Sequence, residues 1–316
     1  RLLKDMNVKI MCTTDDPTST LEFHQQAAKE IEGVKILPTW RPDRAMNLEK
    51  ENWKTFVLDM GKRYNEDISN LNGFINTLQK SHDFFNKNGC MASDHGLFEP
   101  ISYAVDKNTV SEIYEKAYHG ETLTDQEIKD YKAYLLIEFA KMNSETDWVT
   151  QLHIGAVRNY RDKLYNNLGP DTGGDIATHD LEIADNLRYF INKFDQELKI
   201  VLYSMAPNHW STLATISRAF PNVSLGAAWW LNDSPYGMEE QLKYISTVDL
   251  LANFAGMVTD SRKLISYGSR TEMFRRVMAN TVGMMVERGQ IPFSVAVSLV
   301  EGLAYKQQEE LFFTAE

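Results

Sequence analysis

The sequence is poor in cysteine and has no long apolar run. Only two of its 316 residues, Cys12 and Cys90, are cysteines, which argues against a disulfide-stabilised secreted domain. No apolar stretch approaches the roughly 20 residues that a membrane-spanning helix needs, and no signal-peptide pattern is present. We therefore predict a cytoplasmic protein that does not cross a membrane.

Basic residues are also too few for a nucleic-acid-binding protein. The 33 lysines and arginines are outnumbered by 44 acidic residues, giving a net charge of -11. Such a surface repels nucleic acid and anionic membranes, so an anionic substrate would need locally placed arginines. The sequence also lacks a glycine-rich dinucleotide or phosphate loop, a nucleophile elbow and zinc-knuckle cysteine spacing.

What the sequence does contain is a series of short apolar runs, each followed by a helical pattern. Such alternation is typical of buried parallel strands joined by helices. We predict an α/β fold, a TIM-type βα-barrel forming a single domain over 1–316, with helical insertions at about 46–88 and 103–147. The predicted strands are 8–13, 34–40, 89–93, 148–155, 198–203, 223–229 and 254–259.

These seven strands are one fewer than a closed eight-stranded barrel contains. The chain also opens on Arg1-Leu2-Leu3, a pattern typical of the middle of a helix. We therefore expect the first strand of a barrel to be missing from this chain. An open seven-stranded sheet is the alternative.

The segment 257–262 places an acid and an arginine after the last predicted strand. The carboxyl ends of barrel strands are where catalytic groups lie. Asp260 is a candidate metal ligand or general base, and Arg262 offers a rigid guanidinium for a carboxylate. The alternative is that Asp260 or Ser261 caps the next helix while Arg262 is solvated.

The segment 151–158 places His153 inside an apolar strand and Arg158 just beyond it. A histidine at a strand end can ligate a metal or carry a proton. The alternative is a buried histidine with a satisfied hydrogen bond.

Three further predicted strands end in polar or aromatic residues. Arg41 follows the second strand, and its alternative is a surface loop. Asp94 and His95 follow the third strand, where they predict either a proton relay or a cap. Trp229 and Trp230 end the sixth strand; aromatic walls can stack on sugar faces, although core packing is the alternative and is our preference for Trp230.

The chain resembles the uronate (glucuronate) isomerase family, a divergent branch of the amidohydrolase superfamily. The resemblance runs over the whole chain and depends on ordered motifs. They are TTDDP at 13–17, TWRPD at 39–43, SDH at 93–95, QLHIGAVR at 151–158, LGPDTGGD at 168–175, AAWWLND at 227–233 and GMVTDSR at 256–262.

This resemblance implies an aldose–ketose isomerase that interconverts D-glucuronate with D-fructuronate, and D-galacturonate with D-tagaturonate, by an enediol proton transfer. It also implies a divalent metal, with zinc as the first candidate, near Asp260 and His153. Asp260 matches the metal-site acid and is the proposed proton carrier, with Asp94 in reserve. The other matched positions bind substrate: Arg41, Arg158, Trp229 and Arg262.

The family's metal site begins with a His-x-His pair, and none of the seven histidines of this chain forms one. The chain is therefore similar to the C-terminal portion of these enzymes, and its own metal affinity and activity are left open. Two alternatives to the isomerase remain: a metal-dependent hydrolase of the same superfamily, and an inactive fragment that needs a complementary N-terminal segment. The sequence leaves the preferred uronate and the oligomeric state open, a homo-oligomer included.

Overall fold

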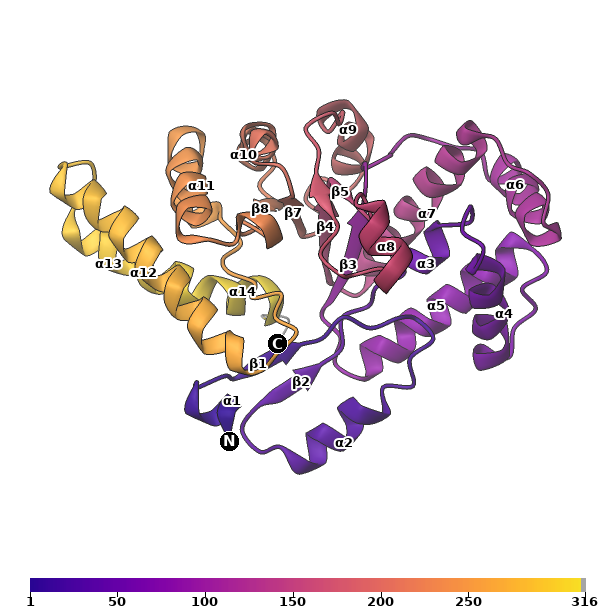
Figure 1. Ribbon diagram of the computed structural model, residues 1–316, viewed down its shortest axis with the longest axis horizontal. Coiled ribbons are helices and arrows are strands. Elements are labelled where there is room, and N and C mark those ends of the chain that lie inside the picture. Colours follow the sequence, from indigo (N-terminus) through magenta and orange to yellow (C-terminus); the bar gives the residue numbers. More distant parts are fainter. Residues whose placement is uncertain (314–316) are drawn as a thin grey trace.

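Parallel strands form a curved row through the centre of the molecule, with helices around it (Figure 1). The computed structural model describes residues 1–313. The central sheet has the order β3 (Ala92–Leu97), β4 (Val149–Ile154), β7 (Ile200–Ser204), β8 (Val223–Leu225), and every pair in it is parallel. The predicted parallel α/β sheet is confirmed.

Isolated bridges extend this row on both sides. A second parallel pair, β1 (Ile10–Cys12) and β2 (Lys35–Leu37), is connected to β3 by a bridge between Trp40 and Ser93. On the other side, a bridge joins Leu225 of β8 to Phe254. Successive strands are thus neighbours in space, which is the arrangement that brings their carboxyl ends together.

The predicted strand 254–259 is wrong beyond its first residue. Only Phe254 pairs with the sheet. Gly256 has φ +86° and Asp260 has φ +43°, and neither value is compatible with extended backbone. The segment therefore passes the edge of the sheet as a loop, and Asp260 is placed by this loop.

Two other strand ends differ from the prediction. Strand β3 runs on through Asp94 and His95 to Leu97, and β8 ends at Leu225, well before Trp229. Ladder hydrogen bonds to β4 continue past Asp94, so its side chain lies within a strand and is fixed by the register of the sheet.

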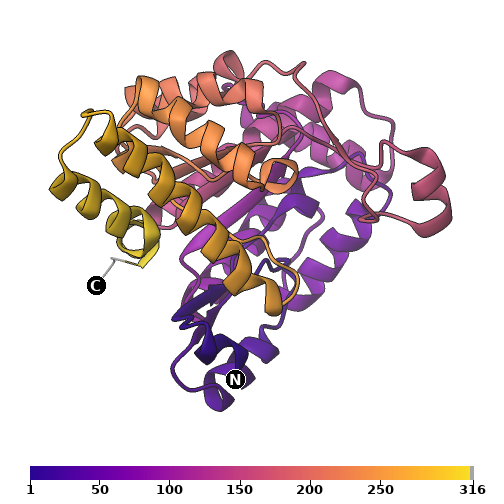
Figure 2. The ribbon, with the colours of Figure 1, turned by 60° about the vertical axis from the view of Figure 1, so that its left-hand side comes forward.

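The helices follow the predicted pattern, including those of both insertions. Figure 2 shows α10, α11 and α12 running past one another on one side of the sheet. Helix α7 begins with a capping box, in which the side chains of Thr124 and Glu127 each accept a hydrogen bond from the other's backbone N–H. The longer helices are α2 (Glu22–Glu30), α4 (Trp53–Tyr64), α5 (Leu71–Lys87), α6 (Lys107–His119), α7 (Asp125–Glu145), α9 (Ala184–Lys193), α10 (Trp210–Ala219), α11 (Pro235–Val248), α12 (Ile265–Glu287) and α13 (Phe293–Glu301).

Shorter helical pieces fill the connections. They are α1 (Leu2–Asp5), α3 (Asp43–Met46), α8 (Asp162–Leu168), α14 (Gln307–Phe313), the 3₁₀ turns Pro207–His209, Trp230–Asn232 and Leu251–Asn253, and the π turn Gly302–Lys306. Among the described residues, no helix is both long and apolar enough to span a bilayer.

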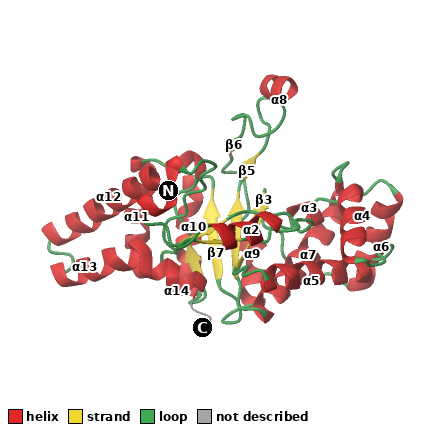
Figure 3. Ribbon diagram, turned by 90° about the horizontal axis from the view of Figure 1, so that it is seen from below, coloured by secondary structure: helices red, strands yellow, loops and turns green. Residues whose placement is uncertain are grey.

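A projecting arm was not predicted. The antiparallel hairpin of β5 (Ala156–Val157) and β6 (Ile176–Ala177) carries α8 away from the body of the molecule (Figure 3). The glycine-rich LGPDTGGD segment lies in this arm, and Gly169 and Gly173 have positive φ. Turns of this kind favour glycine.

The two faces of the sheet carry different side chains. The outer face packs Leu152, Ile154 and Leu202 into a large core against the helices. The inner face carries a smaller apolar cluster that includes Val149, Val201 and Tyr203. Because successive side chains of a strand alternate between faces, the polar residues at 151 and 153 share this inner face.

Candidate active site

The inner face of the sheet collects titratable side chains from neighbouring strands. In the parallel register Asp94 of β3 is opposite Gln151 of β4, and His153 of β4 is opposite Tyr203 of β7. Even spacing along each strand puts these side chains on the same face. Their positions are therefore set by the backbone ladder, which is a rigid support for chemistry.

Asp94 is the centre of this group and is almost fully buried. Arg41 Nη1 donates a 3.0 Å hydrogen bond to Asp94 Oδ2, and His153 Nδ1 lies 2.7 Å from Asp94 Oδ1. Burial by itself raises the pKa of Asp94, but His153 and Arg41 outweigh burial and hold this pKa well below its usual range. Asp94 is thus ionised at physiological pH.

Arg41 is held from its other side by Asp43 of α3. Arg41 Nε donates to Asp43 Oδ2 at 2.8 Å, and the backbone N–H of Gly96 donates to Asp43 Oδ1 at 3.1 Å. A Cβ atom on Gly96 would lie 2.5 Å from Arg41 Nη2, so the guanidinium fits only against a glycine. Burial lowers the pKa of Arg41, but Asp94 and Asp43 reverse the shift and raise it.

Aromatic rings connect His153 to Asp260. The imidazole stacks on Tyr203, with ring centroids 4.2 Å apart and planes 3° from parallel, and meets Trp229 edge-on at 4.7 Å. Trp229 Nε1 donates to Asp260 Oδ2 at 3.1 Å. We use the name inner-face network for this contiguous set: Arg41, Asp94, His153, Tyr203, Trp229 and Asp260.

The local alternatives for Asp260 and Asp94 are both wrong. Helix α12 begins at Ile265 with Leu264 at the N-cap position, so Asp260 does not cap it. His95 points to the opposite face from Asp94, where its Nε2 lies 2.8 Å from Ser93 Oγ and its ring stacks on Phe139. Asp94 and His95 therefore form neither a relay nor a cap, and the histidine beside Asp94 is His153.

The two other predicted arginines lie outside this network, at its rim. Arg158 Nη1 lies 3.0 Å from Asp175 Oδ2, and its guanidinium covers the ring of Trp230 at 4.6 Å. Arg158 and Arg262 both approach Asp171 Oδ1, at 3.5 and 3.7 Å. We use the name rim cluster for this set: Arg158, Asp171, Asp175, Trp230 and Arg262. The predicted core packing of Trp230 holds in part: the ring packs against the inner-face apolar cluster but is only partly buried.

The rim arginines remain accessible. The side chains of Arg158 and Arg262 are 45% and 77% exposed, and that of Asp171 is 55% exposed. Exposed ion pairs at such distances contribute little stability, so an incoming carboxylate can compete with Asp171 for both guanidinium groups.

Comparison with known proteins decides the family. A family model described as glucuronate isomerase matches residues 1–312. The chain is 62% identical to the uronate isomerase of Thermotoga sp. (strain RQ2) over 313 residues, which are 99% of this chain and 69% of that relative.

The chain belongs to the glucuronate (uronate) isomerase family.

Solved structures of the family have the same fold. The crystal structure of the uronate isomerase from Thermotoga maritima superposes with a TM-score of 0.98 at 62% identity, over 99% of this chain and 69% of that chain. The glucuronate isomerase from Caulobacter crescentus superposes with a TM-score of 0.94 at 24% identity, over 100% of this chain and 66% of that chain. The latter likeness shows the fold alone.

Three residues of this candidate site were missed in the sequence analysis. Asp43 holds Arg41, Gln151 accepts a 3.1 Å hydrogen bond from the Tyr203 hydroxyl, and Tyr203 supports His153. The alternation of faces along 149–154 and 200–204 was the signal that could have found the last two. Nothing in the local sequence pairs Asp43 with Arg41 rather than with solvent.

The superfamily resemblance implies a bound metal, but the described residues alone do not supply enough ligands to hold one. Residues 1–313 contain no group of three or more His, Cys, Asp or Glu side chains that could hold an ion. His153 and Asp260 are suitable donors by type, but a catalytic zinc site takes three protein ligands. We therefore derive no chemical step through a metal.

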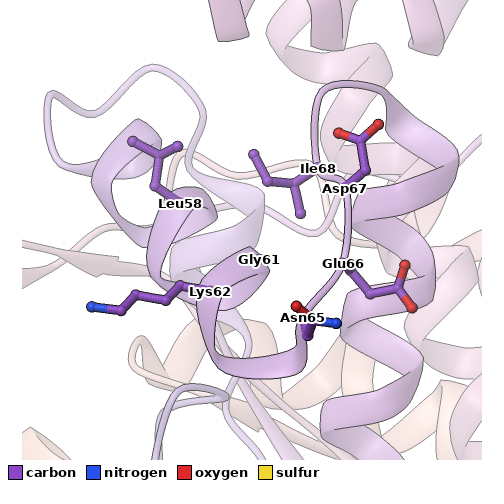
Figure 4. Close-up of a pocket in the computed structure, with 7 residues that line it drawn as sticks. All are labelled: Leu58, Gly61, Lys62, Asn65, Glu66, Asp67 and Ile68. Atoms are coloured by element: carbon purple, nitrogen blue, oxygen red, sulfur yellow. The ribbon is translucent and has the colours of Figure 1, made fainter.

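A hollow elsewhere on the surface lies apart from the candidate site. It measures about 480 Å³, lies between the end of α4 and the start of α5, and has no residue in common with the inner-face network (Figure 4). Its lining residues are Leu58, Gly61, Lys62, Asn65, Glu66, Asp67 and Ile68.

Proposed function

We propose that this chain carries the catalytic sheet face of a uronate isomerase that interconverts D-glucuronate with D-fructuronate, and D-galacturonate with D-tagaturonate. The observation that carries the proposal is the contiguous inner-face network, in a chain that belongs to the glucuronate isomerase family. We further propose that the parallel row of strands is part of a TIM-type barrel forming one domain, which its order and direction support.

The reaction needs a base beside an accessible pocket. The open-chain aldehyde loses the proton on the carbon next to its carbonyl, an enediol forms, and the proton returns to the neighbouring carbon. Asp260 suits the role of proton carrier because it is exposed, and the contacts of the described residues engage only its Oδ2, through Trp229. Asp94 suits it less, since it is almost fully buried between Arg41 and His153 and its lowered pKa makes it a weak base.

The remaining residues of the network orient and stabilise. Asp94 holds His153 and Arg41 in place, and the positive charge of Arg41 favours an oxyanion that develops on the same face. Trp229 forms a wall beside Asp260. At the rim, Arg158 and Arg262 would bind the substrate carboxylate in place of Asp171.

His153 and Asp260 would serve as part of the ligand set of a divalent metal, most simply zinc, whose other ligands would come from outside the described residues.

The test is a uronate isomerisation assay on wild-type protein, on Asp260→Asn and on the matched control Asp59→Asn. Asp59 is an exposed acid of α4, outside both clusters. We expect Asp260→Asn to lower kcat by about 10²–10⁴-fold, the usual contribution of a general base, and Asp59→Asn to match wild type. Normal turnover by Asp260→Asn would remove Asp260 from the mechanism, and no ketose from the wild type with either uronate would refute the proposed reaction.

A further inference from the structure

Tyr203 contacts the imidazole of His153, whose Nδ1 lies beside Asp94. Its phenol ring is 1% exposed and lies flat against the imidazole of His153. The other aromatic neighbour of His153, Trp229, touches it edge-on. The last torsion of a histidine side chain has a broad, roughly two-fold preference, so the strand backbone alone does not fix the plane of this ring. The ring of Tyr203, whose centroid lies 4.2 Å from that of the imidazole, restricts this plane.

Tyr203 is itself fixed from two directions. Its hydroxyl donates to Gln151 Oε1 at 3.1 Å, and Gln151 is two residues before His153 on the same face of β4. Gly226 also lies against the ring: an added Cβ atom there would stand 2.1 Å from Tyr203 Cε1. The ring therefore fills a slot that exists only because residue 226 has no side chain.

We propose that Tyr203, seated against Gly226, is a positioning residue that holds the plane of the His153 imidazole and keeps Nδ1 beside Asp94 Oδ1, 2.7 Å away. His153 then presents its other nitrogen, Nε2, away from Asp94, and the carboxylate fixes which nitrogen carries the proton. The consequence for turnover depends on the proposed isomerase function, whereas the consequence for the ring does not.

The test compares Tyr203→Phe with Tyr203→Leu. Phenylalanine keeps the flat ring and loses only the bond to Gln151, whereas leucine removes the flat surface. Phe190→Leu is the control for loss of a buried aromatic ring, because Phe190 is fully buried in α9 and packs against Phe194. Thermal unfolding of all three variants measures the packing loss.

Two readouts separate positioning from packing. The first is the ¹H–¹⁵N spectrum of labelled protein at one pH, in which the Nδ1–H proton of His153 is assigned by its loss in His153→Gln. We expect wild type and Tyr203→Phe to show one Nδ1–H signal shifted downfield by Asp94, and Tyr203→Leu to lose it. The second is kinetics: we expect Tyr203→Phe to stay within about 3-fold of wild-type kcat and Tyr203→Leu to lose about 10²-fold, as for misplaced catalytic groups, with KM changed less.

The outcomes distinguish the two proposals. A downfield signal that persists in Tyr203→Leu, or a loss of kcat in Phe190→Leu as large as in Tyr203→Leu, would overturn the positioning role. A wild-type protein that shows the signal and its loss in Tyr203→Leu but isomerises no uronate would overturn the proposed function and leave the positioning role standing.

Discussion

The inner-face network and the rim cluster use the same residue types in opposite ways. In the network, Arg41 and Asp94 come from neighbouring segments of the sheet, are partly and almost fully buried, respectively, and contact each other at 3.0 Å. At the rim, Arg262 is 77% exposed and approaches Asp171 only loosely. Charges fixed by strand register are preorganised for chemistry, whereas charges on loops stay available to bind a ligand.

This difference predicts that the network mainly determines stability and turnover, whereas the rim mainly determines substrate affinity. Substitutions of the buried charged side chain of the network, Asp94, should lower both the free energy of unfolding and kcat. Substitution of Arg262 at the rim should raise KM and leave the free energy of unfolding unchanged. Four predictions test this, from the largest expected effect to the smallest.

Asp94→Asn should have the largest effect. It removes one of the two carboxylates that hold Arg41 and the carboxylate beside His153, and breaking one side of a buried ion pair costs up to about 3–5 kcal/mol. The matched rim variant Asp171→Asn removes a carboxylate from an exposed pair and should change stability by about 0.5 kcal/mol or less. Urea unfolding of both proteins measures the difference, and equal losses would contradict the comparison.

Acid should destabilise the protein through two histidines behind the sheet. Burial lowers the pKa of His82 and of His95 to about 4 in the folded state, against about 6.5 when unfolded. A lowered folded pKa means that stability is complete above pH 6.5 and is lost as pH falls from there toward 4. Each histidine accounts for about 3 kcal/mol at most.

The measurement is the free energy of unfolding between pH 7 and pH 4. His95→Gln should flatten this pH dependence, whereas substituting the exposed His119, in the last turn of α6, should not. An unchanged slope in His95→Gln would show that burial of its ring is not the cause. Asp94 adds its own loss only below pH 4, because its folded pKa is held below the usual range.

Gly226→Ala should cost about 1–3 kcal/mol by overpacking, since its Cβ would meet the ring of Tyr203. Gly283→Ala is the matched control: it lies in α12 with nothing within 4 Å of an added Cβ, and alanine there should stabilise by about 0.5–1 kcal/mol. The penalty of Gly226→Ala should shrink in a Tyr203→Leu background. A penalty that is the same in both backgrounds would mean that Tyr203 is not what the added methyl meets.

Arg262→Gln should have the smallest effect on the free energy of unfolding and should mainly change KM. The free energy of unfolding should stay within about 0.5 kcal/mol of wild type, while KM for a uronate rises about 10-fold or more through loss of a charge-assisted contact. Arg276→Gln, an equally exposed arginine of α12 paired with Glu272, should leave KM unchanged. An unaltered KM in Arg262→Gln would remove the rim from substrate binding.

Hydrophobic periodicity in the sequence was enough to predict the central strands and the helices around them. Apolar runs predicted the parallel strands, and helical patterns predicted the helices of both insertions. Strand ends were harder, because the run through 254–259 is as apolar as a strand while Gly256 and Asp260 adopt positive φ. That choice of conformation depends on tertiary contacts of the loop.

The sequence predicted individual residues of the candidate site but not which of them contact one another. Asp94 and His95 are adjacent in sequence and point to opposite faces, whereas Asp94 and His153 meet across a strand pair. Strand register creates that contact, and register is a property of the assembled sheet. The separation of the rim arginines from the network likewise depends on the hairpin of β5 and β6, whose two-residue strands give almost no pattern in the sequence.

The measurement that tests the division between network and rim most directly is a crystal structure of the protein with D-gluconate, a sugar acid with no aldehyde to isomerise. The account predicts that its carboxylate lies between Arg158 and Arg262 with Asp171 displaced, and that its hydroxyl chain extends toward Trp229 and Asp260. A carboxylate bound to Arg41, or a ligand seated in the hollow between α4 and α5, would contradict the account.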